Sequence, residues 1–162
     1  MKRFSIIVLA MMLAGCAARQ VAAPVPAAAG PMACKAISEQ EVAALFDRWN
    51  RSLQTGDPAL VVANYAPRSY LLPTVSNQPR LTSAEKQDYF HHFLANGPVG
   101  TIDQRFLELG CNTVVDSGLY TFTFSKTGAV VRARYTYTYG WDGANWLITS
   151  HHSSGLPEVQ HR

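Results

Sequence analysis

Residues 130–157 read VVRARYTYTYGWDGANWLITSHHSSGLP, and this stretch decides the fold. In its first half, three tyrosines alternate with arginine and threonine. Alternation with a period of two is typical of a strand whose two faces meet different surroundings. Asp142-Gly143 is a strong signal for a tight turn, and a second apolar run begins at Trp146. The stretch therefore predicts a long hairpin with one arginine-bearing face.

Upstream of this hairpin, the sequence pattern is helical. Ser38 and Glu41 form a capping box, in which each side chain can bond the other residue's backbone amide. Asp57-Pro58 predicts the start of a short second helix, and Ser83 the cap of a third helix that ends before Gly97-Pro98. The first helix carries one broad apolar face, made by Val42, Leu45, Phe46, Trp49 and Leu53.

The remaining segments predict strands. Residues 70–72 form a short strand, and everything from residue 101 onward has a strand pattern. We expect strands over 101–109, 111–115 and 119–125, with turns at 116–118 and 126–128. Helices first and a run of antiparallel strands afterwards indicate an α+β domain, whose helices cover one face of the sheet.

Residues 1–16 are expected to be an export signal. Lys2-Arg3 give it a positive start, and the apolar core that follows is too short to span a bilayer. The run from Leu13 to Cys16 resembles a bacterial lipobox, in which the cysteine carries lipid; an ordinary secretory cleavage site is the alternative. By the same resemblance, the absence of aspartate after Cys16 favours the outer membrane, with the domain facing the periplasm and held by lipid alone.

Composition predicts the domain boundaries and excludes one class of partner. Residues 17–33 are rich in Ala and Pro and predict an extended tether, residues 34–158 the folded domain, and residues 159–162 a tail. The chain has 162 residues, of which 48% are hydrophobic and 15% charged, and this suits a single core. Its 14 basic residues nearly balance 11 acidic ones without a run of charge, so we expect no nucleic-acid partner.

The cysteines agree with export. Three cysteines are an odd number for an exported protein. If Cys16 carries lipid, Cys34 and Cys111 remain, and the oxidising periplasm favours a disulfide between them. Two buried free thiols are the alternative.

Several motifs together carry a family resemblance. They are Gly56-Asp57, the loop with Leu72-Pro73, Asn77 and Arg80, the aromatic residues of the third helix, and the run from Asp142 to Pro157. These motifs, over about residues 38–158, resemble the association domain of calcium/calmodulin-dependent protein kinase II, within the SnoaL-like and nuclear-transport-factor-2-like superfamily. The sequence contains no kinase domain, so kinase activity is not carried over.

The resemblance implies a cone-shaped fold. A strongly curved antiparallel sheet would wrap around the N-terminal helices, leave a cavity at its open end and associate with other copies through its outer face. We expect Tyr137 and Tyr139 on that outer face, beside Phe122 or Phe124, because they alternate with the arginine-bearing face. An exposed aromatic patch of this kind usually marks an interface. The expected assembly is a homodimer or a larger homo-oligomer.

The resemblance also implies a ligand site in the cavity. An arginine lines the cavity of the kinase's association domain, here called the kinase hub. Arg134 is the matching position, so we expect it to anchor a small carboxylate. A salt bridge to Asp103 or Glu108, or a hydrated position on the sheet, is the alternative. The other residues expected at the cavity are His152, Tyr65, Tyr135, Asn77 and Arg80.

Two adjacent histidines belong to this expected site. His151 and His152 lie next to each other on a strand, so their side chains point to opposite faces. His152 matches the hub's motif and is expected to face the cavity, as a structural histidine or as a catalytic one. No spacing resembles a metal site and no cofactor motif is present, so we expect neither a metal nor a cofactor.

Three classes of function remain. The first is a non-catalytic lipoprotein that self-associates and binds a small carboxylate. The second is a cofactor-independent enzyme of the SnoaL or ketosteroid-isomerase kind, with Asp103 or His152 as base and a tyrosine as hydrogen-bond donor. The third is a purely structural protein whose cavity is filled by its own side chains.

Overall fold

The computed structural model describes residues 33–157. The predicted signal segment with Cys16, nearly all of the tether, and the tail lie outside the described residues. The elements follow the order α1 (Glu39–Leu53), α2 (Pro58–Val62), β1 (Tyr65–Leu72), α3 (Ser83–Leu94), β2 (Pro98–Leu109), β3 (Thr113–Phe124), β4 (Val130–Trp141) and β5 (Trp146–Gly155). None of the helices in this part of the chain is long and apolar enough to cross a membrane.

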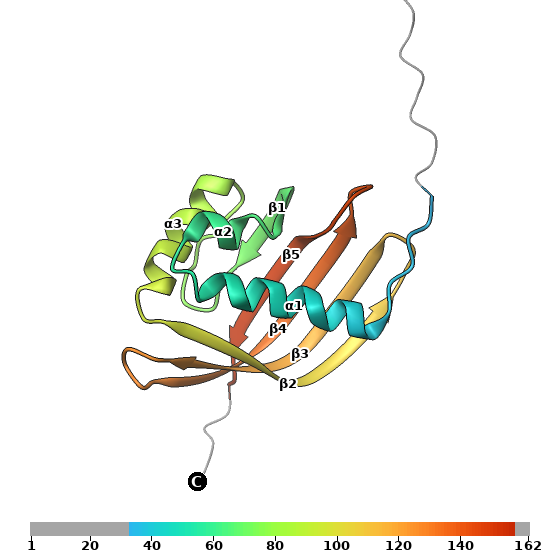
Figure 1. Cartoon of the computed structure of the whole chain (residues 1–162). Coiled ribbons are helices and arrows are strands. Elements are labelled where there is room, and N and C mark those ends of the chain that lie inside the picture. Colours follow the sequence, from blue (N-terminus) through green and yellow to red (C-terminus); the bar gives the residue numbers. More distant parts are fainter. Residues whose placement is uncertain (1–32, 158–162) are drawn as a thin grey trace, which may run out of the picture. The chain divides into compact units, whose positions relative to one another are not determined.

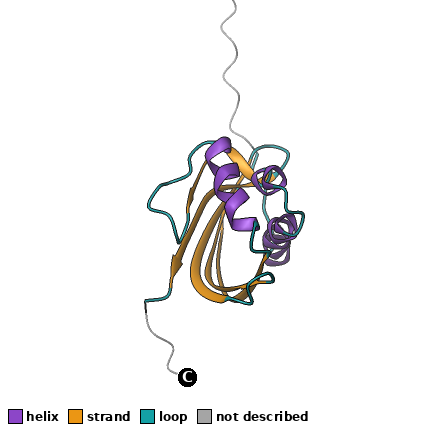
Figure 2. Ribbon diagram, turned by 90° about the vertical axis from the view of Figure 1, so that its left-hand side faces the viewer, coloured by secondary structure: helices purple, strands orange, loops and turns teal. Residues whose placement is uncertain are grey.

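The five strands form one curved sheet in the order β1-β5-β4-β3-β2. Figure 1 shows α1 lying across the concave face, with α2 and α3 near β1. In the side view of Figure 2, the helices lie on one face of the sheet and leave the other face uncovered. The predicted α+β class is confirmed. The sheet is not purely antiparallel, because β1 pairs with β5 in parallel.

Helix α1 is capped at its start, and its polar side chains hold it against the sheet. The predicted capping box of Ser38 and Glu41 is present. Farther along, Asn50 exchanges two hydrogen bonds with the backbone of Gly100, at 2.8 and 2.9 Å, and Gln54 donates to the carbonyl of Pro98. Its apolar face is buried, as the helical spacing predicts.

Helix α3 begins one residue earlier than a cap at Ser83 would give. Its N-cap is Thr82, which forms a capping box with Glu85, and Ser83 is the first helical residue. Both threonine and serine can cap a helix, but only Thr82 has a glutamate three positions further on.

The expected turn at residues 116–118 is wrong, because β3 runs through it without interruption. The irregularity lies instead in β2, where the register shifts between Ile102 and Gln104. Gly118 faces this bulge, and a Cβ atom there would collide with the backbone carbonyl of Gln104. Asp-Ser-Gly therefore marks a close approach inside a sheet, which is a known use of glycine in strands.

The core lies between α1 and the middle of the sheet. Tyr135, Tyr137 and Tyr139 are only 2%, 0% and 0% exposed, and Tyr137 packs against the rings of Phe46 and Trp49. The expectation that Tyr137 and Tyr139 lie on the outer face is therefore wrong. All three tyrosines share one parity on β4, and burying their rings against α1 removes much apolar area from water.

The predicted disulfide is present. Cys34 and Cys111 are bonded, with their Cα atoms 5.1 Å apart. The bond joins the segment before α1 to the loop between β2 and β3. Nearby, the backbone of Lys35 donates to the side chain of Asn112 at 2.7 Å and tightens the same junction.

Candidate functional site

An aromatic cavity of about 110 Å³ lies at one end of the concave face. Its wall takes residues from helices α1 and α3, from the loop after β1, and from strands β1, β3, β4 and β5. Most of the wall is apolar, and its polar members are Thr74, Tyr89, Tyr120, His151 and Ser153. A concave apolar site with a few convergent polar groups is the usual form of a small-molecule site.

His151 is the central polar group of this cavity. Its ring is stacked on Tyr137 with centroids 4.1 Å apart, and Trp49 meets it edge-on at 5.5 Å. Its Nδ1 lies 2.8 Å from the hydroxyl of Tyr65, while its Nε2 is buried without a hydrogen-bond partner among the described residues. Burial lowers the pKa of His151 to about 3, with a smaller contribution from His152, so the ring is neutral near pH 7.

Hydroxyl groups lie at the same cavity. Tyr120 donates to Ser153 at 2.5 Å, and Ser153 also lies 2.5 Å from the hydroxyl of Thr74. Thr74 belongs to the loop after β1, so this contact holds the loop against β5 beside the cavity. Val75 and Val131 line the cavity and are also exposed, which gives it an apolar rim.

A second polar cluster lies on the same inner face. Asp116 is fully buried and accepts hydrogen bonds from Tyr135 at 2.8 Å and from Arg105 Nε at 3.1 Å. Burial raises the pKa of Asp116, and the bonds from Tyr135 and Arg105 oppose that shift. The guanidinium on the inner face is thus Arg105, and its charge is balanced by the protein itself.

The prediction that Arg134 and His152 face the cavity is wrong. Both side chains are exposed, and their neighbours Ala133, Tyr135 and His151 are the buried ones. The period-two alternation was correct, but the faces were assigned the wrong way round. Turning the tyrosines inward and leaving the guanidinium in water avoids the high cost of burying an unpaired charge.

The remaining predicted contacts also lie away from the cavity wall. Tyr65 is outside the wall but contacts two of its residues, His151 and Phe90, and Tyr135 bonds Asp116 instead. Asn77 is exposed in the loop after β1. Asp103 and Glu108, expected as partners of Arg134, are exposed as well, and Asp103 accepts from Thr121. None of the six predicted contacts is in the wall, and their roles in binding stay predictions.

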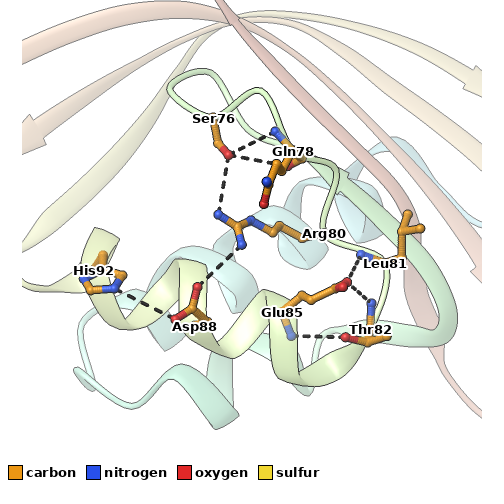
Figure 3. A network of polar contacts seen from close by, with 8 residues as sticks. All are labelled: Ser76, Gln78, Arg80, Leu81, Thr82, Glu85, Asp88 and His92. Atoms are coloured by element: carbon orange, nitrogen blue, oxygen red, sulfur yellow. Dashed lines mark hydrogen bonds and ion pairs between the residues drawn. The ribbon is translucent and has the colours of Figure 1, made fainter.

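Arg80 fastens the loop after β1 to helix α3. Its Nη1 lies 3.5 Å from a carboxylate oxygen of Asp88, and its Nη2 lies 3.4 Å from the hydroxyl of Ser76. Figure 3 shows this network beside the capping box of Thr82 and Glu85. The guanidinium therefore has a structural task at the base of the loop.

Sequence reasoning missed the groups that the fold brings together. His151, Ser153 and Tyr120 share the inner face through the pairings of β3, β4 and β5. The signal was in the sequence, because the parity that buries Tyr135 also turns His151 and Ser153 inward. Within residues 33–157, no group of three or more His, Cys, Asp or Glu side chains could hold a metal ion.

Comparison with known proteins agrees with this architecture. Residues 38–157 match the family model of the calcium/calmodulin dependent protein kinase II association domain. A Xanthomonas campestris structure assigned to the same domain is 44% identical, with a TM-score of 0.72, and the match covers 85% of this chain and 95% of that chain. No curated protein sequence matches this chain.

More distant structures share the fold alone. A nuclear-transport-factor-2-like protein of unknown function from Pseudomonas putida KT2440 is 15% identical with a TM-score of 0.64, over 75% of this chain and 89% of that chain. An iota-carbonic anhydrase from a cyanobacterium, solved with bicarbonate, is 20% identical with a TM-score of 0.68, over 82% of this chain and all of that chain.

Proposed function

This chain belongs to the calcium/calmodulin dependent protein kinase II association domain family, and we propose that it is a self-associating, non-catalytic domain, anchored in the cell envelope, whose cavity binds a small carboxylate. One observation carries the ligand part of this proposal. His151 is in the wall of an aromatic cavity, and its buried Nε2 atom has no hydrogen-bond partner among residues 33–157. A buried polar atom without a partner costs about 1–3 kcal/mol, which a ligand that bonds it recovers.

The size and polarity of the cavity limit the ligand. Its volume of about 110 Å³ is below the roughly 150 Å³ of an engineered cavity that holds benzene, so only a few heavy atoms fit. Most of the wall is apolar, and the hydroxyls of Ser153 and Tyr120 are hydrogen-bonding groups at the same cavity as His151. A carboxyl group on a short aliphatic stem matches this arrangement, because its two oxygens can engage two such groups.

The test is a thermal-shift and calorimetric screen of short carboxylic acids, with bicarbonate included. We expect wild-type protein to bind at least one acid, and His151→Phe to bind it roughly two- to tenfold more weakly, as for loss of one hydrogen bond. Arg134→Ala is the matched control on the outer face and should bind like wild type. Weaker binding by Arg134→Ala with unchanged binding by His151→Phe would contradict the proposal.

An enzyme remains the second candidate because His151 is a titratable group with a perturbed pKa in an apolar cavity. A ketosteroid-isomerase-like reaction would need a carboxylate base there, but no Asp or Glu is among the described residues of the wall. The iota-carbonic anhydrase was solved with bicarbonate, which is why bicarbonate is included as a probe. Conversion of a bound acid to another compound, detected by mass spectrometry, would show that the domain is an enzyme rather than a binding domain.

The envelope location rests on sequence outside the described residues. Its support is the charged start, the short apolar core and the Leu-Ala-Gly-Cys motif that ends at Cys16. We expect the protein to take up labelled fatty acid in cells and Cys16→Ser to take up none. Absence of label from the wild-type protein would remove the lipid anchor, whereas the cavity proposal would stand.

A further inference from the structure

The cavity offers no cationic side chain to balance a bound carboxylate. Neither lysine nor arginine is among the described residues of its wall. Arg105 is already paired with Asp116, and the buried Lys86 donates to the backbone carbonyls of Ser69 and Leu81 at 2.8 and 2.9 Å. An unpaired negative charge in an apolar site is very costly, so either the charge is neutralised or the acid stays out.

The hydrogen bond to Tyr65 decides which nitrogen of His151 carries the proton. The Tyr65 hydroxyl lies 2.8 Å from Nδ1 and has no other acceptor within the described part of the chain. A proton on Nδ1 would leave two groups unpartnered, the hydroxyl hydrogen of Tyr65 and the lone pair of Nε2. A proton on Nε2 leaves only one, so this tautomer has the lower free energy.

His151 therefore cannot take up the ligand's proton. In this tautomer, Nδ1 accepts from Tyr65 and Nε2 is a donor, so the neutral ring has no lone pair left. Burial lowers the pKa of His151 to about 3, which agrees with a ring that stays neutral. The Nε2–H group can still donate to a carbonyl oxygen in the cavity.

We propose that the cavity binds its acid in the protonated, uncharged form, so that binding takes up one proton from solution; this rests on the carboxylate site proposed above. The carbonyl oxygen of the acid accepts from Nε2–H of His151. The acid's own O–H donates to a hydroxyl oxygen of Ser153 or Tyr120. The bound group is neutral, and occupancy rises as the surroundings become more acidic.

No other group at the cavity changes charge near neutral pH. From β5, His152 points to the outer face, and from α1 the cavity meets only the uncharged Trp49. The nearest carboxylate on β3 is Asp116, which is paired with Arg105. Four elements turn tyrosines toward His151 or the cavity, and burial raises the pKa of each, that of Tyr89 to about 12: Tyr65, Tyr89, Tyr120 and Tyr137.

The test compares isobutyric acid with isobutyramide, which has a similar shape but does not ionise. Calorimetry on the purified protein would measure both dissociation constants from about pH 5 to about pH 8. Only the protonated fraction of the acid is competent to bind, so its dissociation constant should rise about tenfold per pH unit above the acid's own pKa. The dissociation constant of the amide should stay the same.

Each outcome separates this inference from the function on which it rests. A dissociation constant for the acid that is equal at both ends of the pH range overturns proton uptake and leaves the carboxylate site standing. If neither compound binds at about pH 5, the carboxylate site falls and this inference with it. Arg134→Ala should reproduce the wild-type pH dependence; a changed dependence would mean that this outer arginine balances the charge and would overturn the inference.

Discussion

Tyr135 and Tyr137 lie two positions apart on β4, and both are buried, but only Tyr135 has a partner for its hydroxyl. Tyr135 donates to Asp116 at 2.8 Å, whereas the Tyr137 hydroxyl has no hydrogen-bond partner among the described residues. Tyr135→Phe should lower the free energy of unfolding by about 1.5–3 kcal/mol, because it removes a bond to a buried carboxylate. Tyr137→Phe, the matched control, should change it little. Equal losses in urea denaturation would contradict this account of the cluster.

His151 should make the stability of the fold depend on pH. Burial lowers its pKa from 6.5 to about 3, so the unfolded chain binds a proton at a pH where the folded chain does not. The stability tied to neutral His151 is therefore complete above pH 6.5 and is lost as pH falls toward 3, at up to about 1.4 kcal/mol per pH unit. Thermal unfolding of His151→Phe should lack this slope, and His152→Gln should keep it. An unchanged slope in His151→Phe would contradict the assignment.

The faces of β4 and β5 were the hardest thing to predict at this scale. Alternation showed that Arg134 and Tyr135 lie on opposite faces, as do His151 and His152. Which face is buried depends on α1, a segment far away in the sequence, and matching Arg134 to an arginine of the kinase hub gave the wrong answer. The cost of burying an unpaired charge would have favoured the tyrosine face.

Among the elements, β3 depends on one glycine. Gly118 lies where the bulge of β2 brings the Gln104 carbonyl against its Cα, at a φ of +157°. Gly118→Ala should lower the free energy of unfolding by at least about 2 kcal/mol, because backbone must move to relieve the collision. Gly155→Ala is the control, since its Cβ would meet only a methyl group of Thr74 at 3.9 Å. Chemical denaturation measures both, and a neutral Gly118→Ala would contradict the bulge.

Elements set by local signals were predictable, and elements set by distant contacts were not. The capping box at Ser38 and the Asp57-Pro58 start fix helix ends through neighbouring atoms, and both are confirmed. The parallel pairing of β1 with β5 joins residues that are far apart in the sequence, such as Tyr65 and Ile148, and no local pattern encodes it. The bulge in β2 also depends on distant contacts and was not predicted, so the Asp116-Ser117-Gly118 run beside it was interpreted as a turn.

For the molecule as a whole, the outer face of the sheet is the surface proposed for self-association. Strand pairings place five side chains in one row across it: Leu72, His152, Thr136, Ser117 and Phe106. Phe106 is 64% exposed, and Leu72 at the other end of the row is also exposed. Such apolar positions on an uncovered face are typical of an interface. The row takes the place of the tyrosine patch that was expected there.

Sedimentation tests this surface. The purified protein should sediment as a dimer or larger, and Phe106→Asp should shift it toward monomer, because a charge at a buried interface is costly. Leu60→Asp on α2 is the control, since Leu60 is an exposed apolar residue on a helix rather than on the sheet. A wild-type monomer at high concentration would contradict self-association. Dissociation by Leu60→Asp alone would move the interface to α2.

At this scale, the family resemblance predicted the fold and the motifs predicted most of the elements. The site was not predictable in the same way, because the cavity wall combines residues from α1, α3 and four strands. Only the packed structure shows that His151 keeps one nitrogen unpartnered while Arg105 is already balanced by Asp116.

We propose the cavity around His151, and not the arginine-bearing outer face, as the place where a small acid binds. A crystal structure of the protein with isobutyric acid at about pH 5 tests it most directly. We predict the acid inside the aromatic cavity, with one oxygen within roughly 3 Å of His151 Nε2 and the other near Ser153 or Tyr120. An acid bound at Arg134 on the outer face, with the cavity unchanged, would contradict the account.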